Sequence, residues 1–148
     1  MIKIAVTGAN GRMGTKIIKN ILKQDDMELV AALGSPDTPL EGKDVGEIIG
    51  VGNIGVPING AQKLSEVLKE KRSDVLVDFT RAHIATHNIK ISAECGVNVV
   101  VGTTGLTDEQ LAEIREAVEK NRIKAVISPN MAIGRMYSLK SLKIWPKF

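Results

Sequence analysis

A glycine-rich run follows the first apolar stretch of the chain and has the composition of a phosphate-binding loop. Glycine lets backbone amides come close to a diphosphate, and the N-terminus of a following helix adds unpaired N–H groups and a partial positive charge. A tight turn that needs glycine for geometry alone is the alternative. The strand before the run, the amphipathic helix after it and the second strand beyond favour dinucleotide binding. The run reads Gly8, Ala9, Asn10, Gly11, Arg12, Met13 and Gly14.

The end of the second predicted strand bears on which nicotinamide dinucleotide the chain binds. Enzymes that use NAD usually carry an acidic residue there, about twenty residues beyond the glycines, which holds the adenosine ribose. This chain has Gly34 and Ser35 at that point. Without a carboxylate a 2′-phosphate is tolerated, and Ser35 together with Arg12 could bind one, which favours NADPH. Asp37 lies just beyond and could reach a ribose hydroxyl, so NADH remains an alternative.

Three further segments rich in polar residues or glycine follow apolar stretches. Any one of them alone is more often a plain turn or helix cap. Together they converge on one crevice if the sheet is doubly wound, because ligands bind outside the carboxyl ends of its strands. The segments are Val77-Asp78-Phe79-Thr80, Val101-Gly102-Thr103-Thr104-Gly105 and Ser128-Pro129-Asn130-Met131-Ala132-Ile133-Gly134.

The elements that must position these loops are indicated by two alternating periodicities, because short β-branched runs are followed by amphipathic stretches of helical length. This order predicts βαβ units and a single α/β domain with a Rossmann-type, doubly wound parallel sheet over residues 1–134. The predicted strands are 2–7, 28–33, 75–79, 97–101 and 124–127, and the predicted helices are 12–24, 61–71, 81–95 and 108–121.

Two local signals refine this pattern. Thr107 before the last helix and Gln110 three residues later predict a capping box, in which each residue bonds the backbone N–H of the other. Residues 35–58 contain eight Gly or Pro residues and are expected to form a loop with short irregular strands.

Composition excludes several functional classes. The 148 residues are 43% hydrophobic and 25% charged, as in ordinary globular proteins, and the 3% of aromatic residues predict an aliphatic core. The net charge of +3 comes from scattered Lys and Arg, so no nucleic-acid partner is expected. No apolar run is long enough to span a membrane, and no leader sequence is evident. A lone Cys95, expected to be a small buried hydrophobe, fits a cytoplasmic location.

His83 and His87 are four residues apart and would share a helix face, as in many zinc-binding pairs. The glutamate that usually lies between such histidines is missing, and no third ligand is apparent. We therefore expect a solvated or core-edge histidine pair and no metal site.

The motifs GANGRMG, VDFT, VGTTG and SPNMAIG, in this order and at these separations, resemble those of the dihydrodipicolinate reductase family. The resemblance implies an NAD(P)H-dependent oxidoreductase of lysine and diaminopimelate biosynthesis that transfers a hydride to a small cyclic dicarboxylate. It also implies that Gly8 to Met13 hold the pyrophosphate, Gly102 to Thr104 line the nicotinamide side, Ser128 to Met131 close over the nicotinamide and Phe79 packs beside that ring. In the family the position of Gly34 is often acidic and that of Ser35 often basic.

The family's substrate domain carries a histidine pair with a lysine, and a Lys-x-Asp-x-Pro-Ser-Gly-Thr segment, neither of which occurs in this chain. We therefore assign no catalytic residue and expect the cofactor-binding half of the reductase. A stand-alone dinucleotide-binding or redox-sensing module is the main alternative, and a CoA-ligase-type Rossmann domain is disfavoured by RMG and GTTG. The resemblance gives no oligomeric state, because the family assembles chiefly through its second domain.

Residues 135–148 have no clear helical stripe, unlike the family's helix after the SPNM motif. Back-translation from Met136 with common codons, read two bases later, gives the amphipathic sequence VFFKILKDLAKV. We therefore interpret this segment as an out-of-frame extension, with the substrate domain missing behind it.

Overall fold

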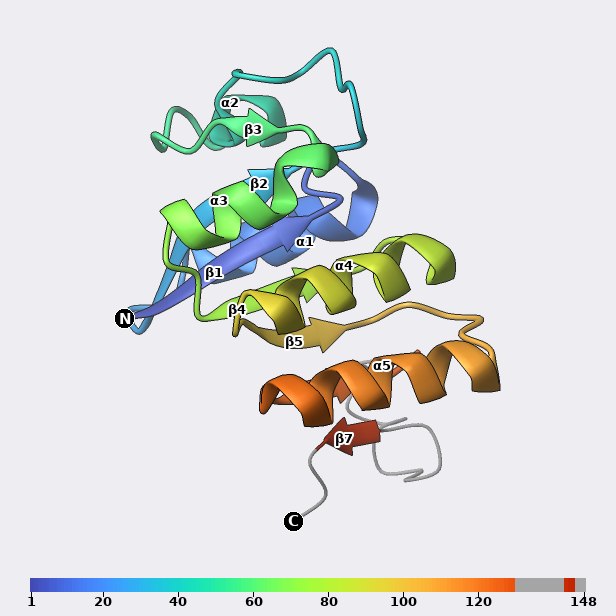
Figure 1. The fold of residues 1–148 in the computed structure, drawn as a ribbon. Helices are drawn as coiled ribbons and strands as arrows, with labels where there is room; N and C mark the ends of the chain where they lie inside the picture. The colour runs from blue at the N-terminus through green and yellow to red at the C-terminus, as the bar shows by residue number, and fades with distance from the viewer. Residues whose placement is uncertain (130–142, 146–148) are drawn as a thin grey trace. The chain divides into compact units, whose positions relative to one another are not determined.

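Strands and helices alternate along the described part of the chain, residues 1–129 and 143–145 of a computed structural model (Figure 1). The chain divides into two units, Met1–Val77 and Asp78–Phe148. The first unit contains β1 (Ile2–Thr7), α1 (Arg12–Ile21), β2 (Met27–Leu33), α2 (Val45–Ile49), β3 (Ile58–Asn59), the 3-10 turn η1 (Ala61–Lys63), α3 (Leu64–Glu70) and most of β4 (Val75–Asp78). The second contains α4 (Ala82–Glu94), β5 (Asn98–Val101), α5 (Asp108–Asn121), β6 (Ala125–Ile127) and β7 (Lys143–Trp145).

In the first unit β1, β2 and β3 are parallel, with β2 between β1 and β3. The β1–β2 register shifts between Ile4 and Ala5, so that Ile4 pairs with Leu29 while Val6 pairs with Ala32. An extra residue in one strand of a pair is a β-bulge, and it changes which side chains share a face. Because of it, both partner pairs belong to one buried cluster.

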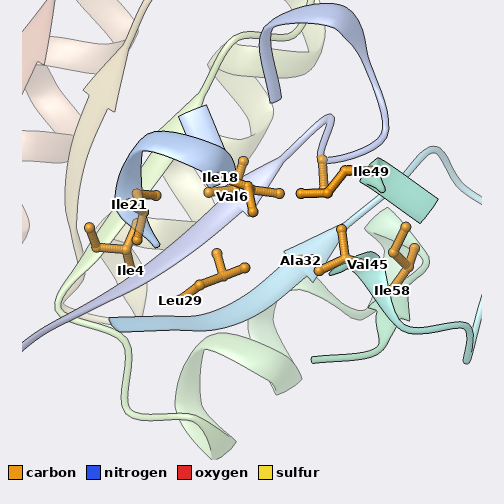
Figure 2. Close-up of a cluster of buried hydrophobic side chains, with 10 residues drawn as sticks. Ile4, Val6, Ile18, Ile21, Leu29, Ala32, Val45, Ile49 and Ile58 are labelled. Carbon is orange, nitrogen blue, oxygen red and sulfur yellow. The ribbon is translucent and has the colours of Figure 1, made fainter. Parts of the chain in front are cut away.

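The core of the first unit is aliphatic, as the composition predicts. Ile18 and Ile21 of α1 are three positions apart and lie over β1, and Val45 and Ile49 of α2 join the same cluster (Figure 2). Residues three and four apart share one helix face, so each helix contributes a short apolar stripe. The α1 and α3 helices cover opposite faces of β1 and β2 (Figure 1).

The expectation that residues 35–58 form only a loop with irregular strands is wrong, because the segment contains the helix α2. Asp44 caps this helix through the backbone N–H groups of Gly46 and Glu47, at 2.8 and 3.2 Å. Its other carboxylate contacts reach Ile54 N–H at 3.1 Å and Val56 N–H at 2.9 Å. One side chain therefore holds both the helix start and the returning chain.

In the second unit β5 pairs with β6 in parallel and β6 pairs with β7 antiparallel. The α4 and α5 helices pack against each other, and α5 also contacts β7. The capping box predicted for Thr107 and Gln110 is confirmed, with both reciprocal bonds present. Trp145 in β7 is buried. The interpretation of residues 135–148 as out of frame stays a prediction, because most of that segment lies outside the described residues.

The predicted strands and helices are confirmed with shifts at their ends. The first helix ends at Ile21 and not at residue 24, and the second predicted helix begins as a 3-10 turn before α3. Cys95, expected to be buried, is partly exposed at the end of α4. Among the described residues, no helix is both long and apolar enough to cross a membrane.

Asp44 makes the stability of the first unit depend on pH. Burial raises the pKa of its carboxyl, but hydrogen bonds from four backbone amides outweigh this and lower the pKa below its usual value of 3.8. A group whose pKa is depressed by folding contributes stability above its unfolded pKa and loses it as the pH falls through the folded pKa. Asp44→Asn should therefore lower the thermal midpoint of unfolding at pH 7. The difference in midpoint between the variant and wild type should shrink as the pH falls below the usual aspartate pKa of 3.8. The prediction would be contradicted if Asp44→Asn destabilised the chain equally at every pH in that range. It would also be contradicted if the control Asp25→Asn, at an exposed aspartate, destabilised the chain as much.

Candidate nucleotide-binding site

The loop after β1 is shaped by backbone hydrogen bonds and one left-handed glycine. Gly8 has a φ of +64°, a region that L side chains rarely adopt. The Gly11 N–H donates to the Gly8 carbonyl at 2.9 Å, and the Ala9 N–H donates to the Leu33 carbonyl at 3.0 Å. These bonds close the loop and tie it to the end of β2.

Gly14 lets α1 pack directly on this loop. A Cβ on Gly14 would lie well inside van der Waals contact with the Gly8 carbonyl oxygen, and within 2.8 Å of the Ala9 Cα. Real Cβ atoms do not come so close, so any larger residue would push the helix away. The third glycine of the run is thus required by packing and not by backbone conformation.

The N-terminus of α1 is exposed and lacks a side-chain cap. Its N-cap is Gly11, which makes no side-chain cap bond, and among the described residues of its first turn there is no acidic side chain. The α4 helix also lacks a side-chain cap and an acidic first turn, whereas α2 and α5 are capped by Asp44 and Thr107. The first N–H groups of a helix have no intrahelical partner, and they carry a partial positive charge that favours anions. The exposed residues here are Asn10, Gly11, Arg12 and Met13.

The tip of β2 carries no carboxylate at the expected place. Gly34 is buried, and its N–H donates to the Asn59 carbonyl at 2.9 Å. A Cβ there would lie 3.2 Å from the Thr38 Cγ2, so a side chain needs only a small shift of Thr38. Ser35 is exposed, as is Asp37, which has a φ of +51°. These two side chains are free of the core, so they are open to a ligand.

In the second unit, the loop after β4 packs on the loop after β5. A Cβ on Gly102 would lie far inside van der Waals contact with three ring carbons of Phe79, so the ring sits against the Gly102 backbone. The Gly102 N–H donates to the Asp78 carbonyl at 2.9 Å. The Thr103 hydroxyl is buried and donates to the Thr80 carbonyl at 2.9 Å. The structure therefore brings Phe79, Gly102 and Thr103 together.

The remaining predicted site residues differ in accessibility. Thr104 and Pro129 are exposed, whereas Ser128 is buried and its N–H donates to the Val101 carbonyl at 3.0 Å. Asn130 and Met131 lie outside the described residues.

The histidine pair offers no metal centre in the described part of the chain. His83 and His87 are both exposed on α4. Among the described residues, no three His, Cys, Asp or Glu side chains are grouped so that they could hold a metal ion.

Sequence reasoning missed a buried polar pair beside the second-unit loops. Asp78 is fully buried, and one of its carboxylate oxygens accepts a hydrogen bond from the Asn88 side chain of α4 at 2.7 Å. The available signal was a polar residue on the buried face of a predicted helix, ten positions after an aspartate that ends an apolar strand.

Parallel strands alternating with helices, and a glycine loop packed against an uncapped helix N-terminus, define a Rossmann-type dinucleotide-binding domain. Residues 2–131 match the family model described as "Dihydrodipicolinate reductase, N-terminus". The chain therefore belongs to the dihydrodipicolinate reductase family, which confirms the resemblance found in the sequence.

Individual relatives agree with the family. The chain is 55% identical over 147 residues to the 4-hydroxy-tetrahydrodipicolinate reductase of Methanocaldococcus jannaschii, covering 99% of this chain and 54% of that protein. It is 58% identical over 143 residues to the enzyme of that name from Methanobrevibacter smithii, covering 97% and 52%. The dipicolinate-bound dihydrodipicolinate reductase from Paenisporosarcina sp. TG-14 superposes with a TM-score of 0.74 at 29% identity, over 95% of this chain and 51% of that chain. The chain thus spans about half the length of these relatives.

The contact between Phe79 and Gly102 yields a double-mutant prediction. Gly102→Ala places a methyl group where the ring lies, and overpacking of this kind costs about 1–3 kcal/mol. In a Phe79→Ala background the same change should cost far less, because the ring is gone. Denaturant unfolding of the four chains measures the coupling. Equal costs of Gly102→Ala in both backgrounds would contradict the contact.

Proposed function

We propose that this chain is the cofactor-binding half of a 4-hydroxy-tetrahydrodipicolinate reductase and binds NADPH or NADH. The observation that carries the proposal is the glycine loop, in which Gly14 lets α1 pack against Gly8 and the N-cap Gly11 leaves the helix N-terminus uncapped and exposed. This arrangement suits a diphosphate, because backbone N–H groups and the helix dipole favour anions there. Family membership supports a nicotinamide dinucleotide as the ligand that carries this diphosphate.

The individual roles extend this proposal. Gly8 to Met13 bind the pyrophosphate through backbone N–H groups, and Arg12 with Ser35 accommodates a 2′-phosphate. Phe79, together with Gly102 to Thr104, contacts the nicotinamide, and Ser128 to Met131 close over it. The cofactor supplies a hydride when bound, and these residues orient its ring and exclude water.

The complete reaction is part of the proposal, since relatives are about twice as long as this chain. It would transfer the hydride to a small cyclic dicarboxylate in lysine and diaminopimelate biosynthesis, in the cytoplasm. Holding two carboxylates and delivering a proton requires groups that the family carries in its second domain. The alternative is that the chain binds the dinucleotide but takes part in no reduction, and serves as a stand-alone dinucleotide-binding or redox-sensing module.

Gly11→Asp tests the pyrophosphate site. Its Cβ would lie 3.1 Å from the Gly8 carbonyl oxygen, and its carboxylate would stand beside the N–H groups proposed to bind the diphosphate. We expect calorimetric titration to show NADPH or NADH binding by wild type and a loss of at least about tenfold in the variant, from like-charge repulsion. The isosteric control Gly11→Asn should retain more affinity. Equal affinity in wild type and Gly11→Asp would remove the glycine loop from the site.

Cofactor preference is tested at the tip of β2. Wild type should bind NADPH at least as well as NADH, because a 2′-phosphate meets no carboxylate at Gly34. Gly34→Glu should shift the balance towards NADH by repelling that phosphate. Gly34→Gln adds the same bulk beside Thr38 without the charge, and it should shift the balance less. Competition titrations that show strong NADH preference in wild type would contradict the prediction.

Turnover separates the cofactor half of a reductase from a complete enzyme. A polypeptide of these 148 residues should show no significant reductase activity, because a positioned acid typically contributes about a hundred- to ten-thousand-fold and none is recognisable here. A chain continued after residue 134 in the alternative frame should gain activity. The assay follows NADPH oxidation with substrate made in situ by the preceding synthase. Robust turnover by the 148-residue chain would contradict this prediction, and His83, His87 and Lys90 would then become candidates for the general acid.

A further inference from the structure

The carboxylate at the end of β4 is fully buried and fully hydrogen-bonded. One oxygen of Asp78 accepts from the Thr80 N–H at 2.7 Å and from the Thr80 hydroxyl at 2.6 Å. The other oxygen accepts from the Asn88 amide at 2.7 Å. Burial of a carboxylate is costly unless donors surround it, so this arrangement depends on all three donors.

Asn88 connects this carboxylate to the covering helix. It lies on the buried face of α4, and its own side chain is only 3% exposed. Its backbone carbonyl accepts from the Ser92 hydroxyl at 2.9 Å. Burial and the bond to Asp78 hold the side-chain amide in place, so Asn88 links Asp78 and the turn after it to α4.

The same turn holds the loop after β5. The Thr80 carbonyl accepts from the Thr103 hydroxyl at 2.9 Å, the Asp78 carbonyl accepts from the Gly102 N–H at 2.9 Å, and the Phe79 ring covers Gly102. A continuous set of contacts thus runs from Asn88 through Asp78 and Thr80 to Thr103. Buried polar networks of this kind fix one geometry when every member is satisfied.

We propose that Asp78 and Asn88 are positioning residues that hold Phe79 and the Gly102–Thr104 segment in the arrangement that receives the nicotinamide ring. They act through Thr80 and Gly102, because their own burial leaves them no surface for a ligand. The inference rests on the proposed function, which places the nicotinamide at these loops. It predicts that a defect in the network weakens binding of the nicotinamide end of the cofactor and spares the adenosine end.

The test compares whole dinucleotides with fragments that lack nicotinamide. Asn88→Leu removes the amide at similar volume, and Thr86→Val serves as control, because the buried Thr86 hydroxyl bonds the Ala82 carbonyl within α4 at 2.9 Å. Calorimetric titrations use NADPH with 2′-phospho-ADP-ribose, and NADH with ADP-ribose. We expect Asn88→Leu to weaken the dinucleotides about tenfold and leave the fragments within about twofold, while Thr86→Val changes neither. Fluorescence of the bound reduced nicotinamide should change in Asn88→Leu alone.

A second pair of variants covers the case in which Asn88→Leu does not fold. Asn88→Asp places two carboxyl groups side by side and should weaken the dinucleotides selectively. In the double variant Asn88→Asp with Asp78→Asn, the amide at position 78 donates to the carboxylate at position 88. This pairing of one donor with one acceptor should recover the affinity for the dinucleotides. Equal loss for dinucleotide and fragment, or no loss at all, overturns the positioning role. If the wild-type chain binds a dinucleotide no more tightly than the matching fragment, only this inference is overturned. If the wild-type chain binds neither the dinucleotides nor the fragments, the proposed function is overturned as well.

Discussion

The packing of α1 on the glycine loop is the contact on which the first unit depends. Gly14 leaves no space between the helix and the Gly8 carbonyl, and this fixes where α1 begins. Ile18 and Ile21 follow at helical spacing and complete the cluster over β1. The same helix begins at the N-cap Gly11, which has no side chain to cap it. The packed helix therefore keeps an uncapped N-terminus, which favours anions.

Two aspartates organise the irregular segments in different ways. Asp44 accepts from four backbone N–H groups of its own segment, so it holds a loop and a five-residue helix together by local backbone bonds. Asp78 accepts two bonds from one residue of its turn and a third from the side chain of Asn88 on a covering helix. The first arrangement stabilises a local segment. The second connects the buried face of α4 to two strand-end loops, and this is why we assign it a positioning role.

The elements with a strong local signal could be predicted from the sequence. The β1 strand was predicted with its observed ends, and the capping box of α5 is present, because both depend on neighbouring residues. The α2 helix was missed because five residues carry little periodicity, and the bonds of its cap reach Ile54 and Val56, ten and twelve residues away. The β7 strand was missed because its pairing with β6 is equally non-local.

In the candidate site, too, local features could be predicted from the sequence and non-local ones could not. The glycine run could be found because its geometry is encoded in consecutive residues, whereas the bond between Asp78 and Asn88 forms only once β4 and α4 are in place.

Glycine itself shows why such a pattern has to be interpreted with the structure. Four glycines lack space for a Cβ, and each is crowded by a different group: the Gly8 carbonyl at Gly14, the Gly52 carbonyl at Gly46, the Gln62 side chain at Gly60, and the Phe79 ring at Gly102. In the structure Gly14 brings a helix end to a strand end, Gly46 lets a loop fold over α2, and Gly102 seats an aromatic ring on the backbone. Gly14 and Gly102 each belong to a motif found in the sequence, whereas Gly46 belongs to none. At the end of β5 the ring of Phe79 therefore takes the space that a side chain on residue 102 would need.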